Sequence, residues 1–348
     1  MPKKRIALLG ASGIVGQRFC QLLTDHPFFE EPDLYSWQRS ENKRLVDILK
    51  VPEETISPTL LEQKMTSLDS SAILKEGYDA IFSAIPTSLD RNIELELSEH
   101  GARIFTNSGM NRMRQDVPIV VPEVNDSHLS IIENKNGYII ANGNCSSIGL
   151  ALPLKPLLKF NPSHVEVTTM QALSGAGYPG VPSLDSVSNL VPFIEAEEEK
   201  IMSEVPKILG DFDSGKITSK ELQIDATCTR VPVKEGHTEA VTITFPREVD
   251  LEKMTESLKS FAGNPQKLSL PTAPQNPIII ESANDRPQPA LDLWRGRPAR
   301  ARGMAVTVGR LRSSGNSLRF VTLSHNTVRG AAGGSVLNAE LVYSRGLL

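Results

Sequence analysis

A lone cysteine, Cys145, stands among small and polar residues between a short apolar run and a region of helical pattern. The apolar pair at 139–140 precedes it, and serines, an isoleucine and a glycine follow it. A turn between a strand and a helix leaves a sulfur atom accessible, and the positive end of a helix favours the thiolate. The stretch therefore predicts a reactive thiol, while a packed structural turn remains the alternative.

Three later segments carry groups that could act on a substrate beside that thiol. His237 follows Arg230 by seven residues, with a strand-like run on each side of the intervening turn. A hairpin of this kind presents both side chains near one cavity, and imidazole exchanges protons near pH 7. Glu197 and Lys200 are three residues apart at the start of a predicted helix and share one of its faces. Gln171 ends a run rich in β-branched residues, which predicts a strand.

Each of these groups also has an ordinary structural interpretation. Acidic residues stabilise the first turn of a helix, so Glu197 and Lys200 could form a surface pair. Gln171 could face solvent, and His237 could be a core or surface histidine. Arg112, in the first half of the chain, is either a surface charge or an anion ligand. The local sequence leaves all of these alternatives open.

A glycine-rich turn near the N-terminus indicates a nucleotide site. Gly10, Gly13 and Gly16 separate the apolar run 5–9 from a helical pattern of apolar residues. A strand, a glycine turn and a helix in this order bind a dinucleotide pyrophosphate at the helix N-terminus. The spacing departs from G-x-G-x-x-G because Ser12 stands where the second glycine is expected, and a tight turn without ligand is the alternative.

The segment after the expected second strand indicates which nucleotide is bound. An NAD site has an acidic residue there to hold the ribose hydroxyl. Here the strand-like run 34–36 is followed by a basic turn that contains Arg39 and Ser40. A guanidinium pairs bidentately with phosphate, so this turn favours NADP over NAD, with a solvated charged loop as the alternative.

Composition excludes several other classes of protein. The chain has 348 residues, a formal net charge of −4, 39% hydrophobic residues and three cysteines. The negative charge argues against nucleic acid or an acidic membrane as partner, and no apolar run reaches the roughly 18 residues of a membrane span. The cysteines lack C-x-x-C pairing, so we expect neither disulfides nor a metal site. A cytoplasmic protein is expected.

The chain length predicts two domains. Alternating strands and helices over the first part indicate an α/β fold with a Rossmann-type, doubly wound parallel sheet, followed by a second, α+β domain. We expect the boundaries 1–144 for the nucleotide-binding domain and 145–322 for the catalytic and dimerisation domain. Residues 323–348 are expected to form a helix that packs back on the first domain.

Taken together, the motifs resemble the aspartate-β-semialdehyde dehydrogenase family over nearly the whole chain, and most closely its archaeal and fungal branch. The segments that carry the resemblance are G-A-S-G-I-V-G at 10–16, N-C-S at 144–146, S-G-A-G at 174–177, E-x-x-K at 197–200, R-x6-H at 230–237 and N-T-V-R-G-A-A at 326–332. The resemblance implies NADPH-dependent, reversible conversion of L-aspartyl-4-phosphate to the semialdehyde. That step leads to lysine, threonine, methionine and isoleucine.

The resemblance also implies a role for each site residue. Cys145 would be the nucleophile, His237 the general acid/base, and Gln171 would orient the acyl intermediate. Arg230 and Glu197 would hold the substrate carboxylate and amino group. Phosphate would be bound by Lys200, Arg112 and Asn111. NADP would be contacted by Gly10, Ser12, Gly13, Ile14, Arg39, Ser40, Ser83, Ser174, Gly175 and Asn326.

Other functions remain open from sequence. N-acetyl-γ-glutamyl-phosphate reductase has similar architecture, but its cysteine usually stands in a Pro-Gly-Cys-Tyr-like context, unlike Asn144-Cys145-Ser146 here. An NADP-binding regulator without chemistry belongs to a different class, and a cysteine hydrolase would have no use for the first domain. The family resemblance further implies a homodimer or homotetramer.

Overall fold

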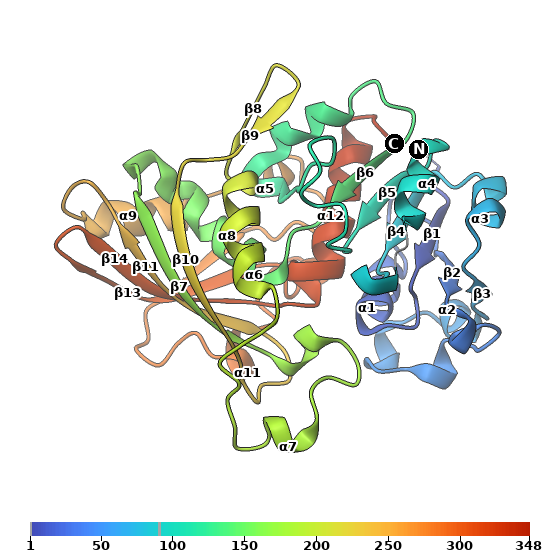
Figure 1. The fold of residues 1–348 in the computed structure, drawn as a ribbon, viewed down its shortest axis with the longest axis horizontal. Helices are drawn as coiled ribbons and strands as arrows, with labels where there is room; N and C mark the ends of the chain where they lie inside the picture. The colour runs from blue at the N-terminus through green and yellow to red at the C-terminus, as the bar shows by residue number, and fades with distance from the viewer. Residues whose placement is uncertain (1, 90–91) are drawn as a thin grey trace.

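The fold is that of a computed structural model, which describes residues 2–89 and 92–348. Two six-stranded sheets lie side by side along the long axis of the molecule, with the C-terminal helix α12 (Gly333–Ser344) between them in the view of Figure 1. No helix in this described part of the chain combines the length and the apolar character that crossing a membrane requires.

The first sheet is parallel throughout, with the strand order β3-β2-β1-β4-β5-β6. Its strands are β1 (Ile6–Leu9), β2 (Asp33–Ser36), β3 (Thr66–Ser67), β4 (Ala80–Ser83), β5 (Arg103–Thr106) and β6 (Tyr138–Ala141). The accompanying helices are α1 (Ile14–Leu23), α2 (Pro58–Glu62), α3 (Ser70–Glu76), α4 (Ile93–Glu99) and α5 (Pro122–Asn125). Strand order reverses beside β1 and β4, where an open α/β sheet binds its ligand. The predicted doubly wound sheet is confirmed.

The second sheet is mixed, with the order β10-β7-β11-β14-β13-β12. Its strands are β7 (His164–Gln171), β10 (Gln223–Arg230), β11 (His237–Thr244), β12 (Ile278–Glu281), β13 (Val306–Ser314) and β14 (Ser317–Ser324), and β8 (Asp211–Asp213) with β9 (Lys216–Thr218) forms a separate pair. The helices of this region are α6 (Cys145–Leu154), α7 (Ser183–Ser186), α8 (Glu197–Ile208), α9 (Leu251–Lys259), α10 (Asn264–Lys267) and α11 (Pro289–Asp292). The predicted α+β domain is therefore present.

The prediction of a hairpin between Arg230 and His237 is wrong, because the two strands do not pair with each other. β10 and β11 are not neighbours, because β7 lies between them, parallel to β10 and antiparallel to β11. The connection from Arg230 to His237 therefore passes the end of β7, where Gln171 stands. All three side chains still meet at one end of the sheet.

Register arranges the side chains of this sheet in rows beneath α6. Cross-strand partners point to the same face, and so do residues two apart on a strand. The rows, from the end of the sheet inward, are Gln171, His237 and Ser324; then Thr169, Glu239 and Thr322; then Val167, Val241 and Phe320. Two polar rows thus precede the apolar core of the domain.

The C-terminal helix α12 joins the two domains. Its residues from Gly333 to Val342 are buried. Val336 and Leu337 belong to the same apolar cluster as Ile6 and Phe82 of the first sheet. Burial of these apolar side chains stabilises the packing of the helix against the first domain. The domain boundaries at 144 and 322 stay a prediction.

Candidate active site

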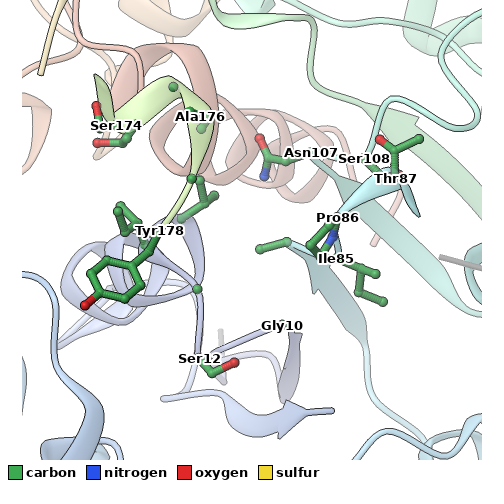
Figure 2. Close-up of a pocket in the computed structure, with 18 of the residues that line it drawn as sticks. Gly10, Ser12, Ile85, Pro86, Thr87, Asn107, Ser108, Ser174, Ala176 and Tyr178 are labelled. Atoms are coloured by element: carbon green, nitrogen blue, oxygen red, sulfur yellow. The ribbon is translucent and has the colours of Figure 1, made fainter. Parts of the chain in front are cut away.

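A cleft of about 690 Å³, a size typical of small-molecule sites, has walls from both domains. Ser174, Ala176 and Tyr178 of the second domain face Gly10 and Ser12 of the first across it (Figure 2). Its lining includes, of the residues predicted from sequence, Gly10, Ser12, Gly13, Ile14, Arg39, Ser40, Arg112, Cys145, Ser174, Gly175 and Asn326. The structure therefore brings the predicted thiol and most of the predicted nucleotide contacts to one cleft.

The turn after β1 fits a dinucleotide. Gly10 has φ +80°, and a Cβ there would stand 2.7 Å from the carbonyl oxygen of Ala84. The helix α1 begins at Ile14, and no side chain caps its N-terminus. Free N–H groups in a first helical turn bind phosphate, and a glycine turn lets the phosphate approach the backbone. The residues present thus match the requirements of a pyrophosphate.

Cationic groups line another part of the cleft. Arg39 lies in a short helical turn directly after β2. Lys50 also lines the cleft; its Nζ donates to the Ser12 carbonyl at 2.6 Å and lies 4.9 Å from the centre of the Tyr178 ring. The sequence analysis missed Lys50, which reaches the site only through folding from 38 residues beyond Ser12. These charges suit a phosphate group on the nucleotide.

The helix that begins at Cys145 is held by Asn144. The Asn144 side-chain oxygen accepts the N–H groups of Ser146 and Ser147, a standard N-cap arrangement. Gly330 packs against the cysteine so closely that an added Cβ would stand 2.6 Å from the Cβ of Cys145. These contacts fix the thiol, which is half-buried, at the edge of the cleft.

His237 reaches that thiol. Its Nε2 lies 3.2 Å from the Cys145 sulfur, and its Nδ1 accepts the N–H of Ala172 at 3.1 Å. Because Nδ1 is an acceptor in this contact, a neutral ring carries its proton on Nε2, facing the sulfur. The imidazole is thereby placed to donate to a thiolate, or to an oxyanion formed beside it.

The thiol and the imidazole are both neutral in the free protein at pH 7. Burial raises the pKa of Cys145 to about 12, and the negative charge of Glu197 also raises it, against the opposing effect of Arg112 and Arg230. Burial lowers the pKa of His237 to about 3. An additional charge or a proton transfer during attack is therefore needed to form the thiolate.

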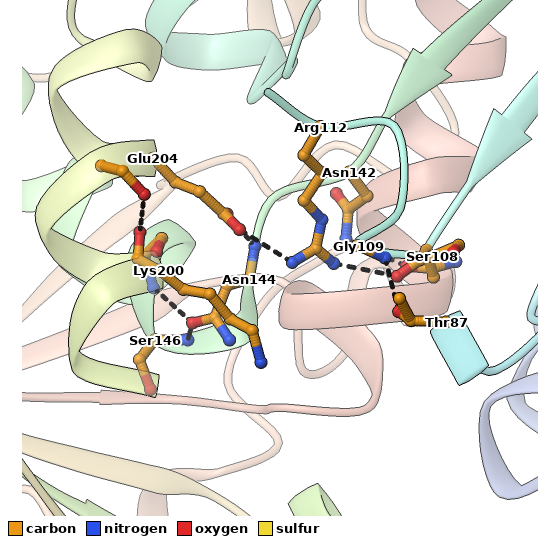
Figure 3. Close-up of polar contacts among 12 residues, drawn as sticks. Thr87, Ser108, Gly109, Arg112, Asn142, Asn144, Ser146, Lys200 and Glu204 are labelled. Carbon is orange, nitrogen blue, oxygen red and sulfur yellow. Dashed lines mark hydrogen bonds and ion pairs between the residues drawn. The ribbon is translucent and has the colours of Figure 1, made fainter. Parts of the chain in front are cut away.

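Arg112 is oriented toward the thiol region by a buried ion pair. Its guanidinium lies 3.0 Å from Glu204, which also accepts the backbone N–H of Asn144 (Figure 3). A second guanidinium nitrogen donates to the carbonyl of Asn107. The remaining Nε is buried, with no hydrogen-bond partner in the described structure. Arg112 also lines the cleft, so its positive charge can attract an anion bound there.

Glu197, Gln171, Arg230 and Lys200 form one polar group beside these residues. Glu197 accepts hydrogen bonds from Gln171 and Asn144 and lies 3.5 Å from the Nζ of Lys200. Burial acts to raise the pKa of Glu197, but the bond from Asn144 and the charge of Lys200 outweigh it and hold the pKa below its usual value. Glu197 is thus a buried carboxylate next to cations, the environment that an ammonium and a carboxylate on one substrate require.

Seven predicted site residues are not among those that line the cleft. Five of them, His237, Gln171, Glu197, Arg230 and Lys200, belong to the groups described above, and the other two are Ser83 and Asn111. Ser83 is the last residue of β4 and is fully buried, while the cleft is lined by the segment that begins at Ala84. Asn111 is buried and donates from its amide to Glu94. The roles assigned to Ser83 and Asn111 stay predictions without a place in the cleft. No group of three potential metal ligands occurs among the described residues.

The fold and the site together define a two-domain, nucleotide-binding dehydrogenase. The semialdehyde dehydrogenase NAD binding domain matches residues 5–132, and the semialdehyde dehydrogenase dimerisation domain matches residues 154–329. The chain belongs to the semialdehyde dehydrogenase family. This confirms the family expected from the sequence motifs.

Curated relatives and a solved structure agree with this assignment. An aspartate-semialdehyde dehydrogenase of Archaeoglobus fulgidus is 42% identical, over 97% of each chain. A malonyl CoA reductase (NADP) of Metallosphaera sedula is 37% identical, over 99% of this chain and 98% of its own. The crystal structure of aspartate semialdehyde dehydrogenase with NADP from Candida albicans superposes with a TM-score of 0.89 at 35% identity, over 99% of this chain and 100% of its own.

Proposed function

We propose that this protein is an NADPH-dependent aspartate-semialdehyde dehydrogenase, which reduces L-aspartyl-4-phosphate to the semialdehyde and releases phosphate. The observation that carries the proposal is the pairing of Cys145 with His237 at 3.2 Å, at the edge of a nucleotide cleft and beside Glu197. The two activities named among the relatives reduce acyl groups, and both suit a thiol in this position.

The chemistry follows from the residues around the sulfur. Attack of Cys145 on the acyl carbon would form a thioester and expel phosphate, with Arg112 and Lys200 as cations for that leaving group. NADPH supplies the hydride that reduces the thioester when it is bound. His237 would donate from Nε2 to the developing oxyanion, and collapse of the resulting hemithioacetal would release the aldehyde.

The substrate class is supported by Glu197 and Arg230. An aspartyl group carries both an ammonium and a carboxylate. Glu197 is a buried carboxylate suited to the ammonium, and Arg230 a buried guanidinium suited to the carboxylate.

A malonyl thioester is the second candidate, because one relative is a malonyl CoA reductase. A malonyl group has the carboxylate but lacks the ammonium, and would leave Glu197 without that partner. An N-acetylglutamyl group has an amide in place of the ammonium. Glu197 therefore favours the aspartyl substrate over both.

The test is the reverse reaction with the purified protein. NADPH formation from NADP⁺ is measured with aspartate semialdehyde and phosphate, with malonate semialdehyde and coenzyme A, and with N-acetylglutamate semialdehyde and phosphate. We expect turnover with aspartate semialdehyde that depends on phosphate, and slower reduction of NAD⁺ than of NADP⁺. Turnover with only malonate semialdehyde, or with only N-acetylglutamate semialdehyde, would reassign the substrate. Absence of turnover with all three aldehydes would indicate a nucleotide-binding protein without this activity.

We further propose that two copies of the chain associate through the second domain. The loop around α7 projects from the body of the molecule and carries exposed apolar side chains, including Leu184 at 90% and Phe193 at 64% exposure (Figure 1). An apolar patch of this kind marks a protein contact. The matched dimerisation domain includes this loop. A reducing compartment, the cytoplasm, suits a thiol enzyme with free cysteines.

A further inference from the structure

Lys207, near the C-terminal end of α8, is a buried lysine that the proposed chemistry does not use. The residue is 6% exposed. Its Nζ lies 2.6 Å from the carbonyl oxygen of Arg112, 2.8 Å from that of Arg114 and 2.9 Å from that of Val117. Burial lowers the pKa of Lys207 to about 8, so at pH 7 the side chain is mainly an ammonium with three N–H donors. All three donors therefore have acceptors, and all the acceptors belong to one loop.

That loop depends on side chains for its shape. The segment 107–118 follows β5 and contains neither helix nor strand. Within it, the N–H of Arg112 reaches the carbonyl of Gly109 only at 3.4 Å. The bonds from Lys207 are shorter, and one of them holds the carbonyl of Arg112 itself. A buried carbonyl without a donor costs free energy, so these bonds keep the loop against α8.

The same face of α8 holds the other end of Arg112. Helix positions 197, 200, 204 and 207 are three or four residues apart, a spacing that places their side chains on one face. Lys200 and Glu204 extend from α8 on the side of Arg112 (Figure 3). Glu204 binds the guanidinium of Arg112 at 3.0 Å, and Lys207 binds its carbonyl at 2.6 Å. One helix thus fixes Arg112 by its side chain and by its backbone, and also carries Lys200.

This arrangement affects how the two cations could share a phosphate. Each charge-assisted hydrogen bond needs its own geometry, so the distance between the cations must match the anion. Arg112 stands in an irregular loop and Lys200 on a helix. Ordering the loop only when phosphate binds would weaken binding by the conformational entropy lost. The bonds from Lys207 order the backbone of Arg112 before the anion arrives.

We propose that Lys207 is a positioning residue for phosphate: it holds the backbone of Arg112 against α8, at a fixed place relative to Lys200. This inference rests on the proposed function, in which those two cations receive the leaving phosphate. Lys207 itself does not line the cleft, and no bond is made or broken at its nitrogen. Its loss should therefore weaken phosphate binding and leave the chemistry at Cys145 in place.

The test is the reverse reaction at pH 7 with the phosphate concentration varied. Lys207→Met removes all three donors at nearly constant side-chain length, whereas Lys207→Gln keeps two. The KM for phosphate should rise roughly 10-fold in Lys207→Met and less in Lys207→Gln. The KM values for aspartate semialdehyde and NADP⁺ should not change, and kcat at saturating phosphate should stay within about twofold of the wild type. The glutamine variant carries the test if the methionine variant does not fold.

Two further variants separate this role from a general contribution to stability. Lys135→Met is the matched control, because Lys135 also donates to the loop, but from the surface and at 3.4 Å from the carbonyl of Asp116. It should keep the wild-type KM for phosphate. In an Arg112→Gln background, Lys207→Met should raise that KM little further, because its effect acts through Arg112.

Three results would overturn the positioning role. They are an unchanged KM for phosphate in both Lys207 variants, an equal rise of all three KM values, and full additivity with Arg112→Gln. In each case an active wild type leaves the proposed function standing.

Phosphate binding can also be measured without turnover, so failure of the proposed function is distinguishable. The readout is the phosphate concentration that halves the rate at which iodoacetamide alkylates Cys145. That concentration should be roughly 10-fold higher in Lys207→Met than in the wild type. A wild type that is protected by phosphate but shows no turnover would refute the proposed function alone. Equal protection of the wild type and Lys207→Met, or no protection of either, would refute the role of Lys207.

Discussion

The first domain contributes to the site turns that follow parallel strands, and the second contributes reactive side chains, several of which stand at the ends of strands beside the cleft. Gly10, Ala84 and Asn107 each stand one residue beyond the end of a parallel strand and line the cleft. On the other side, His237 and Gln171 stand at the ends of strands of the mixed sheet, and their positions depend on register. One half of the site is thus built from backbone, and the other from side chains.

This difference predicts which kind of substitution damages each half of the site. A backbone surface that a ligand approaches closely is damaged when atoms are added to it. A constellation of side chains is damaged when atoms are removed, because the reacting groups themselves are lost. Changes in the second domain should therefore abolish chemistry while binding persists, and changes in the first should weaken binding.

The largest effect is expected for Cys145→Ala. Without the sulfur no thioester forms, and turnover should fall by at least roughly 10⁴-fold, while the affinity for NADP stays near that of the wild type. The measurement is phosphate-dependent NADPH formation together with nucleotide titration. Cys20→Ala, which removes a buried thiol from the first domain, is the control and should remain active. Undiminished turnover of Cys145→Ala would contradict the mechanism.

A smaller loss is expected for His237→Asn. The amide keeps a polar group near the sulfur but cannot carry a proton through the cycle, so kcat should fall roughly 10²- to 10⁴-fold. NADP affinity should not change, because His237 does not line the described cleft. Equal losses of kcat and of NADP affinity would mean that the variant disturbs the fold of the sheet.

The comparison also explains what could be predicted from the sequence. The turn after β1 is a local feature, since the strand, Gly10 and the helix are consecutive, and the nucleotide-binding domain predicted from it is confirmed. The sequence predicts individual cofactor contacts less accurately than it predicts the domain. Ser83 was predicted to contact the cofactor, but the residues that line the cleft start one position later, where β4 has ended.

The part of the site in the second domain depends on strand order, which cannot be predicted from a local sequence pattern. The run from Arg230 to His237 is typical of a hairpin, yet β7 inserts between the two strands and brings Gln171 with it. Lys207 was overlooked for a related reason. In the sequence of α8 a lysine in the last turn resembles a solvent-facing residue, and only folding brings the carbonyl of Arg112 to it.

Addition of one methyl group at Gly10 tests the backbone half. In Gly10→Ala the Cβ would meet the Ala84 carbonyl at 2.7 Å, in addition to the strain of a positive φ. We expect a lower melting temperature and an NADPH dissociation constant raised roughly 10-fold or more. Gly77→Ala is the matched control, because Gly77 also has positive φ but nothing within 4 Å of the added atom. It should lose stability from strain alone, about 1–2 kcal/mol, and bind NADPH normally.

The smallest effect is expected for Arg39→Ala, which tests a prediction in the first domain that depends on a side chain. If the guanidinium holds the 2′-phosphate, its loss should weaken NADPH binding roughly 10-fold and leave NADH binding unchanged. The preference for NADPH over NADH should therefore decrease. Arg44→Ala is the control, since Arg44 is paired with Asp47 and Glu62 on the surface. Kinetics with both nucleotides measure the effect. An unchanged preference in Arg39→Ala would transfer the recognition of the phosphate to another cation of the cleft, of which Lys50 is the candidate because it already lies against Ser12.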